Sequence, residues 1–127
     1  MNVLVDTSVW VDYFRGTGGL RVMDRLIEEN LVVTNDLILA ELIPPLKVRG
    51  ERRLIALLRE IATYPVSINW DDLIALQVTC LRNGVNGIGL PDLIIAQNAM
   101  QHQLRLLTQD KQFALLSRHV PLSLCGQ

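Results

Sequence analysis

The sequence has 127 residues, the usual length of one domain. Half of the residues are hydrophobic and 20% are charged, which excludes an intrinsically disordered chain. The formal net charge of −1 excludes a polybasic protein that coats nucleic acid without selection. We therefore expect a single domain over residues 1–127, with a core that needs neither disulfides nor structural zinc.

Short apolar runs alternate with amphipathic segments from one end of the chain to the other. The expected strands cover residues 3–6, 31–34, 66–68, 105–108 and 122–124, the third of them at the edge of the sheet. The expected helices run from residue 7 or 8 to 14 and over 20–29, 37–47, 51–62, 70–82, 91–102 and 111–117. This alternation predicts an α/β fold, a three-layer α/β/α sandwich with a mostly parallel central sheet.

Local signals set several of these boundaries. Asn35 or Asp36 is expected to cap the third helix, and Asn69 the fifth. Pro91 is expected to begin the sixth helix. The pair Pro44-Pro45 is expected to disturb the third helix, because proline lacks the N–H that a helix interior requires.

Nothing in the sequence suggests export or a membrane. Asp6 and Asp12 interrupt the N-terminal apolar run, so a signal peptide is not expected. The longest apolar stretch, residues 31–46, is broken by acids and prolines. Cys80 and Cys125 do not form a CxxC pair, and their spacing permits a disulfide without requiring one. We predict a cytoplasmic protein without membrane contact.

Two acids are expected at the carboxyl ends of parallel strands. Asp6 closes the first strand, and Asp110 follows the strand 105–108. In open α/β sheets this edge is where ligands bind. Each acid is also an ordinary helix N-cap, so neither decides the function by itself.

Glu41 shares a helix face with Leu37 and Ile38, three and four residues before it. We therefore expect its carboxylate on an apolar face, where burial would raise its pKa and favour a cation as partner. The alternative is a solvent-facing glutamate on an edge helix.

Asp92 lies in the first turn of the helix that Pro91 begins, where the helix dipole favours an anion. The small apolar stripe Ile95, Ala96 and Ala99 indicates that this helix points inward. Capping alone would also explain an acid at this position. Taken together, four acids without nearby histidine or cysteine suit a hard cation with oxygen ligands, Mg²⁺ or Mn²⁺.

The segments that carry these acids resemble those of one known family. Asp6-Thr7-Ser8 after an N-terminal strand resembles the opening of a PIN domain, and Leu39-Ala40-Glu41-Leu42 its acidic helix motif. Asp92-Leu93-Ile94-Ile95-Ala96 is similar to its central helix, and residues 107–113 to its closing strand and turn. These four motifs occur in the family's order and together span nearly the whole chain. With residues 9–15, they are most similar to the VapC toxins of prokaryotic toxin–antitoxin pairs.

The resemblance implies a metal-dependent endoribonuclease that hydrolyses RNA phosphodiester bonds. The implied catalytic residues are Asp6, Glu41, Asp92 and Asp110. Asp6 and Asp92 would be the direct ligands of Mg²⁺ or Mn²⁺. Glu41 and Asp110 would act through water or hold a second ion.

Four further residues have expected supporting roles. The hydroxyls of Thr7 and Thr108 could orient the carboxylates of the site. Lys111 and Arg15 are candidates for contacts with the phosphates of the RNA substrate.

The family resemblance also implies partners. VapC toxins pair with a small antitoxin whose tail blocks the pocket, and we expect such an antitoxin together with a homodimer. Apolar residues on the first helix, such as Trp10, Tyr13 and Phe14, could form either surface. Core packing is the expected use for at least half of them.

Other classes stay open from sequence alone. One is a catalytically inactive PIN-like interaction module. Another is a different Mg²⁺-dependent phosphoryl-transfer domain. A haloacid-dehalogenase-type phosphatase needs a second aspartate two residues after the first, where this chain has Ser8. A receiver domain usually has adjacent acids after its first strand, whereas Asp6 stands alone.

Overall fold

The computed structural model describes residues 1–18 and 20–125. Within these residues, five strands form one fully parallel sheet in the order β3-β2-β1-β4-β5. The strands are β1 Val3–Val5, β2 Val32–Thr34, β3 Ala62–Thr63, β4 Arg105–Leu107 and β5 Ser123–Leu124. The first strand therefore lies at the centre, with Leu4 in register with Val33 on one side and Leu106 on the other.

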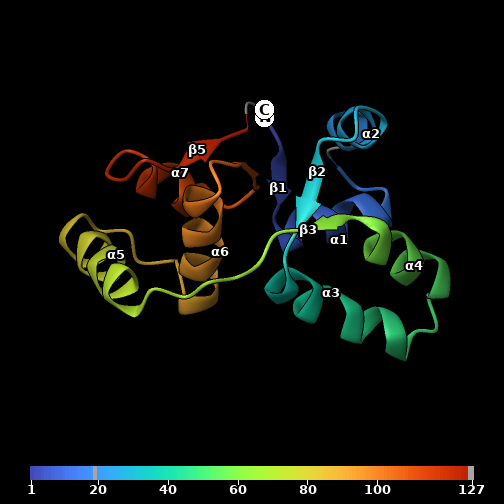
Figure 1. Cartoon of the computed structure of the whole chain (residues 1–127), viewed down its shortest axis with the longest axis horizontal. Helices are drawn as coiled ribbons and strands as arrows, with labels where there is room; N and C mark the ends of the chain where they lie inside the picture. Colours follow the sequence, from blue (N-terminus) through green and yellow to red (C-terminus); the bar gives the residue numbers. More distant parts are fainter. Residues whose placement is uncertain (19, 126–127) are drawn as a thin grey trace.

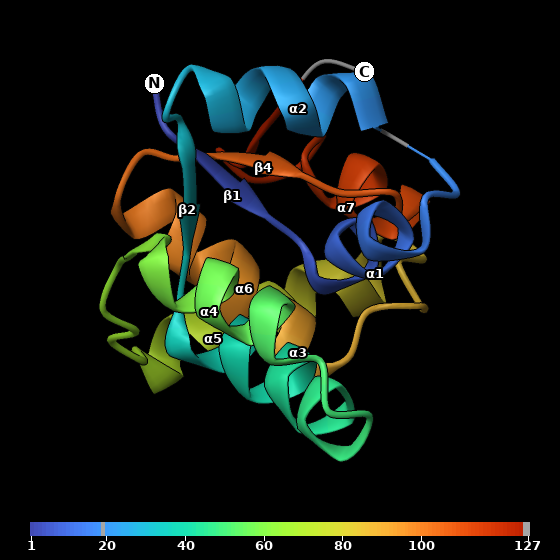
Figure 2. The same cartoon turned by 90° about the vertical axis from the view of Figure 1, so that its right-hand side faces the viewer.

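Helices cover both faces of this sheet. In the described part of the chain they are α1 Thr7–Arg15, α2 Leu20–Glu28, α3 Asp36–Val48, α4 Arg52–Glu60, α5 Trp70–Arg82, α6 Leu90–Gln101 and α7 Lys111–Leu116. Figure 1 shows α1 to α4 mostly to the right of β1 and β2, and α5 to α7 to their left. The view from the side in Figure 2 has α1 to α4 nearest the viewer. The predicted three-layer α/β/α sandwich is confirmed.

The sheet centre is the most completely buried part of the fold. Val3, Leu4 and Val5 have no exposed surface, because helices cover the strand on both faces. The largest fully buried side chains are Trp10 of α1 and Phe113 of α7. The carboxyl end of β1, where Asp6 lies, is thus anchored in the core.

The helix caps agree with the sequence, but the effect of the prolines does not. Asn35 caps α3 by accepting a hydrogen bond from the Ile38 N–H at 2.9 Å. Helix α3 then runs unbroken through Pro44 and Pro45, so the expected disturbance is wrong. The two carbonyls that lose a helical donor belong to exposed residues 40 and 41, where water can replace the missing N–H groups.

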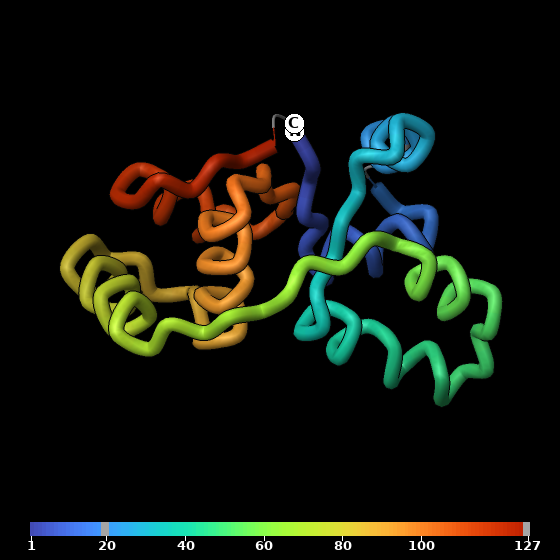
Figure 3. Tube along the Cα trace, in the orientation of Figure 1, coloured from blue at the N-terminus to red at the C-terminus, as the bar shows by residue number. Residues whose placement is uncertain are grey.

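The predicted strand at 66–68 is also wrong, because the third strand is β3, a few residues earlier. Residues 64–69 instead cross extended from the α4 side to the α5 side, as Figure 3 shows. Side-chain amides of α6 hold the carbonyls of this crossing. The bonds run from Asn98 to Pro65 at 2.9 Å, from Gln101 to Ser67 at 2.8 Å and from Gln97 to Asn69 at 2.9 Å. These side chains replace the neighbouring strand that the sequence pattern suggested.

The structure also bears on whether the cysteines form a disulfide and whether a helix could span a membrane. Cys80 and Cys125 are both buried and both free. Across the described residues, every helix is too short or too polar to span a bilayer.

Candidate active site

A cleft of about 420 Å³ opens at the carboxyl edge of the sheet. It lies where β1 gives way to α1, beside one face of α3, the first turn of α6 and the loop before α7. The lining residues are Asp6, Thr7, Ser8, Glu41, Asp92, Gln109 and Asp110. All four acids singled out from the sequence therefore line the same cleft.

Asp6 is the most buried of these acids, with only 6% of its surface exposed. It caps α1 by accepting a hydrogen bond from the Thr7 N–H at 2.8 Å, and its other oxygen accepts one from the Thr108 hydroxyl at 2.8 Å. Burial raises the pKa of Asp6, the two hydrogen bonds lower it, and the negative charges of Asp92 and Glu41 raise it further. The net effect is a raised pKa for a carboxyl that faces other acids.

Glu41 differs from the expectation, because its side chain is exposed. Ile38 on the same side of α3 is fully buried, but the glutamate carboxylate reaches past it to the cleft. There it accepts a hydrogen bond from the Thr7 hydroxyl at 2.7 Å. The predicted burial of Glu41 is therefore wrong, whereas its position in the cleft is as predicted.

Asp92 is half-buried at the start of α6, and one of its oxygens accepts a hydrogen bond from the Gly89 N–H at 3.3 Å. Burial raises its pKa, the bond from Gly89 lowers it, and the charge of Asp110 raises it. The small apolar stripe that follows it is buried as expected, at Ile95, Ala96 and Ala99.

Asp110 caps α7, accepting a hydrogen bond from the Gln112 N–H at 2.9 Å. The Gln112 side chain also accepts one from the Gly87 N–H at 3.1 Å. A Cβ at position 87 would lie only 2.7 Å from the Gln112 Cγ, so glycine allows this close approach. The loop that leads to Asp92 is thus fixed to the helix turn that follows Asp110, a contact that the sequence pattern did not predict.

The two cationic candidates border the cleft without lining it. Lys111 is exposed and lines a neighbouring cavity of about 260 Å³, which shares Gln109 and Asp110 with the cleft. Arg15 is exposed and lines a groove of about 300 Å³ between α1, α3 and α4, which shares Glu41 with the cleft. Both side chains can approach a polyanion that enters the cleft from either side.

The aromatic residues of α1 take three different roles. Trp10 is fully buried in the core, and the Tyr13 hydroxyl donates a hydrogen bond to Asp24 at 2.7 Å. Phe14 lines the groove between α1, α3 and α4. The core packing expected for at least half of these aromatic residues is thus found for Trp10.

Two polar residues of the cleft were not identified from the sequence. Ser8 and Gln109 lie next to predicted site residues, but neither type carries a specific signal for metal or phosphate chemistry. Among the residues that the structure describes, no three His, Cys, Asp or Glu side chains form a ready-made metal cage. An open cleft with few direct protein ligands is the kind of site that Mg²⁺ uses, because this ion keeps several of its waters.

Comparison with known proteins identifies the family. The family model described as PIN domain matches residues 3–118. The chain belongs to the PIN domain family. Ribonuclease VapC11 of Mycobacterium tuberculosis and a VapC ribonuclease of Mycobacterium bovis are each 28% identical to this PIN domain over 126 residues, covering 91% of this chain and 92% of theirs. PIN domain ribonucleases of the VapC type generally depend on divalent metal ions.

Solved structures confirm the fold of this PIN domain. VapBC2 of Rickettsia felis, bound to a DNA fragment from its promoter, matches with a TM-score of 0.76 and 20% identity over 98% of both chains. VapBC-1 of nontypeable Haemophilus influenzae matches with a TM-score of 0.74 and 19% identity, covering 98% of this chain and 97% of that one.

Proposed function

We propose that this PIN domain is a metal-dependent endoribonuclease, the toxin of a toxin–antitoxin pair. The observation that carries the proposal is the gathering of Asp6, Glu41, Asp92 and Asp110 around one cleft, from four segments far apart in the sequence. The family membership and the two related ribonucleases support it. RNA is the proposed substrate and hydrolysis of a phosphodiester bond the proposed reaction.

The cleft suits a hard divalent cation, Mg²⁺ or Mn²⁺. Asp6 is a buried carboxyl beside the charges of Asp92 and Glu41, and a cation would relieve both its burial and this repulsion. Asp6 and Asp92 would hold the ion directly, and Glu41 and Asp110 would act through water or hold a second ion. When bound, the ion would lower the pKa of a water and stabilise charge on the phosphodiester.

The chain's own residues would supply the remaining parts of the reaction. The Thr108 and Thr7 hydroxyls keep the carboxylates of Asp6 and Glu41 in place. Glu41 or Asp110, not needed as a direct ligand, would accept the proton of the attacking water. Lys111 and Arg15 would bind phosphates on either side of the scissile bond.

Cleavage of total RNA tests the proposal, with the new ends mapped. The wild type should cleave with Mg²⁺ or Mn²⁺ and stop in EDTA, and Asp6→Asn and Asp92→Asn should lose cleavage while keeping their fold. Asp72→Asn makes the same change on exposed α5, outside the cleft, and should cleave normally. Full cleavage by Asp6→Asn would contradict the mechanism. A wild type that binds RNA without cleaving it would favour the inactive interaction module.

The groove between α1, α3 and α4 is the proposed place for a segment of the antitoxin. Its apolar lining includes Phe14, Leu42 and Leu46, and it meets the cleft at Glu41, so a chain in this groove would block entry of RNA. Phe14→Asp should weaken capture of the co-expressed antitoxin. Val48→Asp, an 88% exposed position outside the groove, is the matched control.

A further inference from the structure

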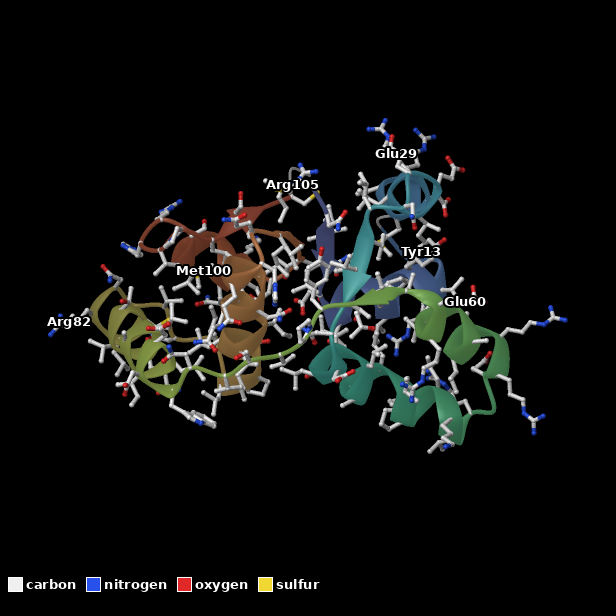
Figure 4. The ribbon with its side chains drawn as sticks, in the orientation of Figure 1. Tyr13, Glu29, Glu60, Arg82, Met100 and Arg105 are labelled. Atoms are coloured by element: carbon white, nitrogen blue, oxygen red, sulfur yellow. The ribbon has the colours of Figure 1, made fainter. Side chains whose placement is uncertain are left out.

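The cavity of about 260 Å³ that borders the cleft has a chemistry of its own. We call it the α7 cavity, because one of its walls is that helix. In Figure 4, Arg105 marks the amino end of β4, at the top of the view. The α7 cavity lies toward the other end of this strand, at the edge of the sheet that also carries the cleft. Its interior is formed by Leu106, Thr108, Leu124 and Cys125 from β4, β5 and the residues after them, and by Ala114 of α7.

The α7 cavity is mostly apolar inside and polar at its mouth. Leu106 has no exposed surface, and Cys125 is 8% exposed, so both belong to the floor. Gln109 and Lys111 also line the cavity but are exposed, so they mark its opening. Its volume lies just below the roughly 300–1,000 Å³ of pockets for drug-sized ligands. The space therefore suits one small ring system that has a polar edge.

The small side chain of Ala114 keeps this space open. Lys111 and Ala114 are three residues apart on α7, so both lie on the helix face that lines the cavity. The core side of the helix is occupied by Phe113 and Leu116, which have no exposed surface. Packing of α7 on the sheet is thus complete without the cavity, and a longer side chain at position 114 would fill it.

Two residues join the α7 cavity to the cleft, because Gln109 and Asp110 line both spaces. Within residues 1–18 and 20–125, the Gln109 carboxamide makes no hydrogen bond. Its donor and its acceptor are therefore both available to a ligand. A nucleotide with its phosphate in the cleft would have its base beside the mouth of the α7 cavity.

The cleft itself cannot distinguish one base from another. Its four carboxylates, and the ion that they would hold, act on phosphate, which is the same in every nucleotide. Proteins that read single-stranded RNA take up unstacked bases and form hydrogen bonds with their polar edges. The α7 cavity offers the two features that such a site needs, apolar walls and a carboxamide at the opening.

We propose that the α7 cavity binds the base of a nucleotide next to the scissile phosphate, and that Gln109 forms hydrogen bonds with the polar edge of that base. This inference rests on the proposed nuclease function. Lys111 would hold the phosphate of the same nucleotide at the mouth, in agreement with its proposed phosphate contact. The α7 cavity would then supply the sequence preference that the cleft lacks.

Binding of single-stranded RNA in EDTA tests the cavity without cleavage. The probes are a fluorescently labelled strand of mixed sequence and a strand of equal length without bases, both followed by anisotropy. Ala114→Leu should weaken binding of the intact strand by about fivefold or more, the lower end of what one bound base contributes, and leave the abasic strand unchanged. Lys111→Ala should weaken both strands, because it removes a phosphate contact.

Ala56→Leu is the matched control, because it makes the same change on exposed α4, outside the cavity, and should alter neither affinity. Circular dichroism checks that all variants are folded. A wild type without preference for the intact strand, or an equal effect of Ala114→Leu on both strands, would overturn the proposal.

Cleavage of synthetic RNAs that differ only in the bases beside the cut tests the role of Gln109. The wild type should cleave one of them several-fold faster, and Gln109→Leu, which keeps the size but loses both hydrogen-bonding groups, should narrow that difference. An unchanged preference in Gln109→Leu would overturn its role. A wild type that cleaves no RNA would refute the nuclease function instead, and the binding measurement in EDTA would still decide whether the cavity takes up a base.

Discussion

The Thr108 hydroxyl donates a hydrogen bond to the Asp6 carboxylate at 2.8 Å, although the two residues are separated by 102 positions. The same hydroxyl oxygen accepts a hydrogen bond from the Asp110 N–H at 3.1 Å. One hydroxyl at the end of β4 therefore connects the acid that follows β1 with the acid that caps α7. Thr108 is 4% exposed, so water cannot easily replace it.

Thr108→Val should remove these bonds with little change of shape. We expect a loss of about 1.5–3 kcal/mol in the free energy of unfolding, because the hydroxyl bonds a carboxylate. We also expect RNA cleavage to fall by roughly 10–100-fold, as for groups that orient metal ligands. Denaturant unfolding and cleavage rates measure the two effects. Thr108→Ser retains the hydroxyl and should keep most of the folding stability and most of the cleavage rate. Equal behaviour of Thr108→Val and Thr108→Ser would rule out this role for the hydroxyl.

Asp6→Asn should stabilise the metal-free protein, increasingly so at higher pH. Because the folded-state pKa of Asp6 is raised, its protonated form favours the folded state below about pH 3.8, its ordinary pKa. This stability is lost as the pH rises through the raised pKa, whereas asparagine stays neutral throughout. The variant's melting temperature should therefore exceed the wild type's near neutral pH, and the difference should shrink as the pH falls. A lower melting temperature for Asp6→Asn at neutral pH would show that the carboxylate is structural.

Divalent ions should stabilise the folded wild type. An ion that binds only the folded state raises the free energy of unfolding by roughly 2.7 kcal/mol at 100 times its dissociation constant. Melting curves with added Mg²⁺ or Mn²⁺ measure this effect. The rise should disappear in Asp6→Asn and Asp92→Asn, and it should persist in the exposed control Asp72→Asn. Equal shifts in all four proteins would place ion binding outside the cleft.

Gly87→Ala should disturb the cleft through Gln112. The added methyl would lie 2.7 Å from the Gln112 Cγ, so that side chain must move and release its bond with the Gly87 N–H. We expect a loss of about 1–2 kcal/mol in the free energy of unfolding. Gln112→Ala makes room for the methyl, so Gly87→Ala should cost less in that background. Additive losses in the double-mutant cycle would argue against the contact.

Asn98→Leu should destabilise the fold more than any exposed amide substitution. The Asn98 amide accepts a hydrogen bond from the Asn35 side chain at 3.0 Å and donates one to the Pro65 carbonyl at 2.9 Å. It is 1% exposed, so leucine would leave buried polar groups unpaired, a loss of about 2–4 kcal/mol. Gln101→Leu, which removes one exposed bond, should lose less than about 1 kcal/mol. Thermal unfolding measures the loss of stability in both variants. Similar losses for Asn98→Leu and Gln101→Leu would contradict the expectation that the buried amide contributes more.

The sequence predicted the features that neighbouring residues determine. The run Val3–Val5 identifies β1 because three consecutive apolar residues suit a strand covered on both faces. The start of α5 follows from Asn69, whose side chain accepts a hydrogen bond from the Asp72 N–H. The positions of Asp6 and Asp110 at one edge of the sheet follow from the rule that parallel strands end together. Glu41 and Asp92 reach the same edge from helices α3 and α6.

Features that depend on distant parts of the chain were not predictable in this way. The segment 66–68 has a strand-like composition, but side-chain amides of α6 bond the carbonyls of Ser67 and Asn69. Glu41 lies next to buried residues on α3, yet its side chain lines the open cleft. The contact between Gly87 and Gln112 joins a loop to the first turn of α7, and the sequence of neither segment indicates the other.

The central position of β1 also affects when the site can form during synthesis. Leu4 pairs with Leu106 of β4, and Asp6 accepts a hydrogen bond from Thr108. The first strand can therefore complete its contacts only after a segment about a hundred residues later has been synthesised. Domains fold as units as the chain leaves the ribosome, and contacts of such long range form slowly. An incomplete nascent chain that lacks β4 would therefore carry Asp6 without its completed cleft. The cleft would therefore be complete only after β4 and Thr108 have left the ribosome.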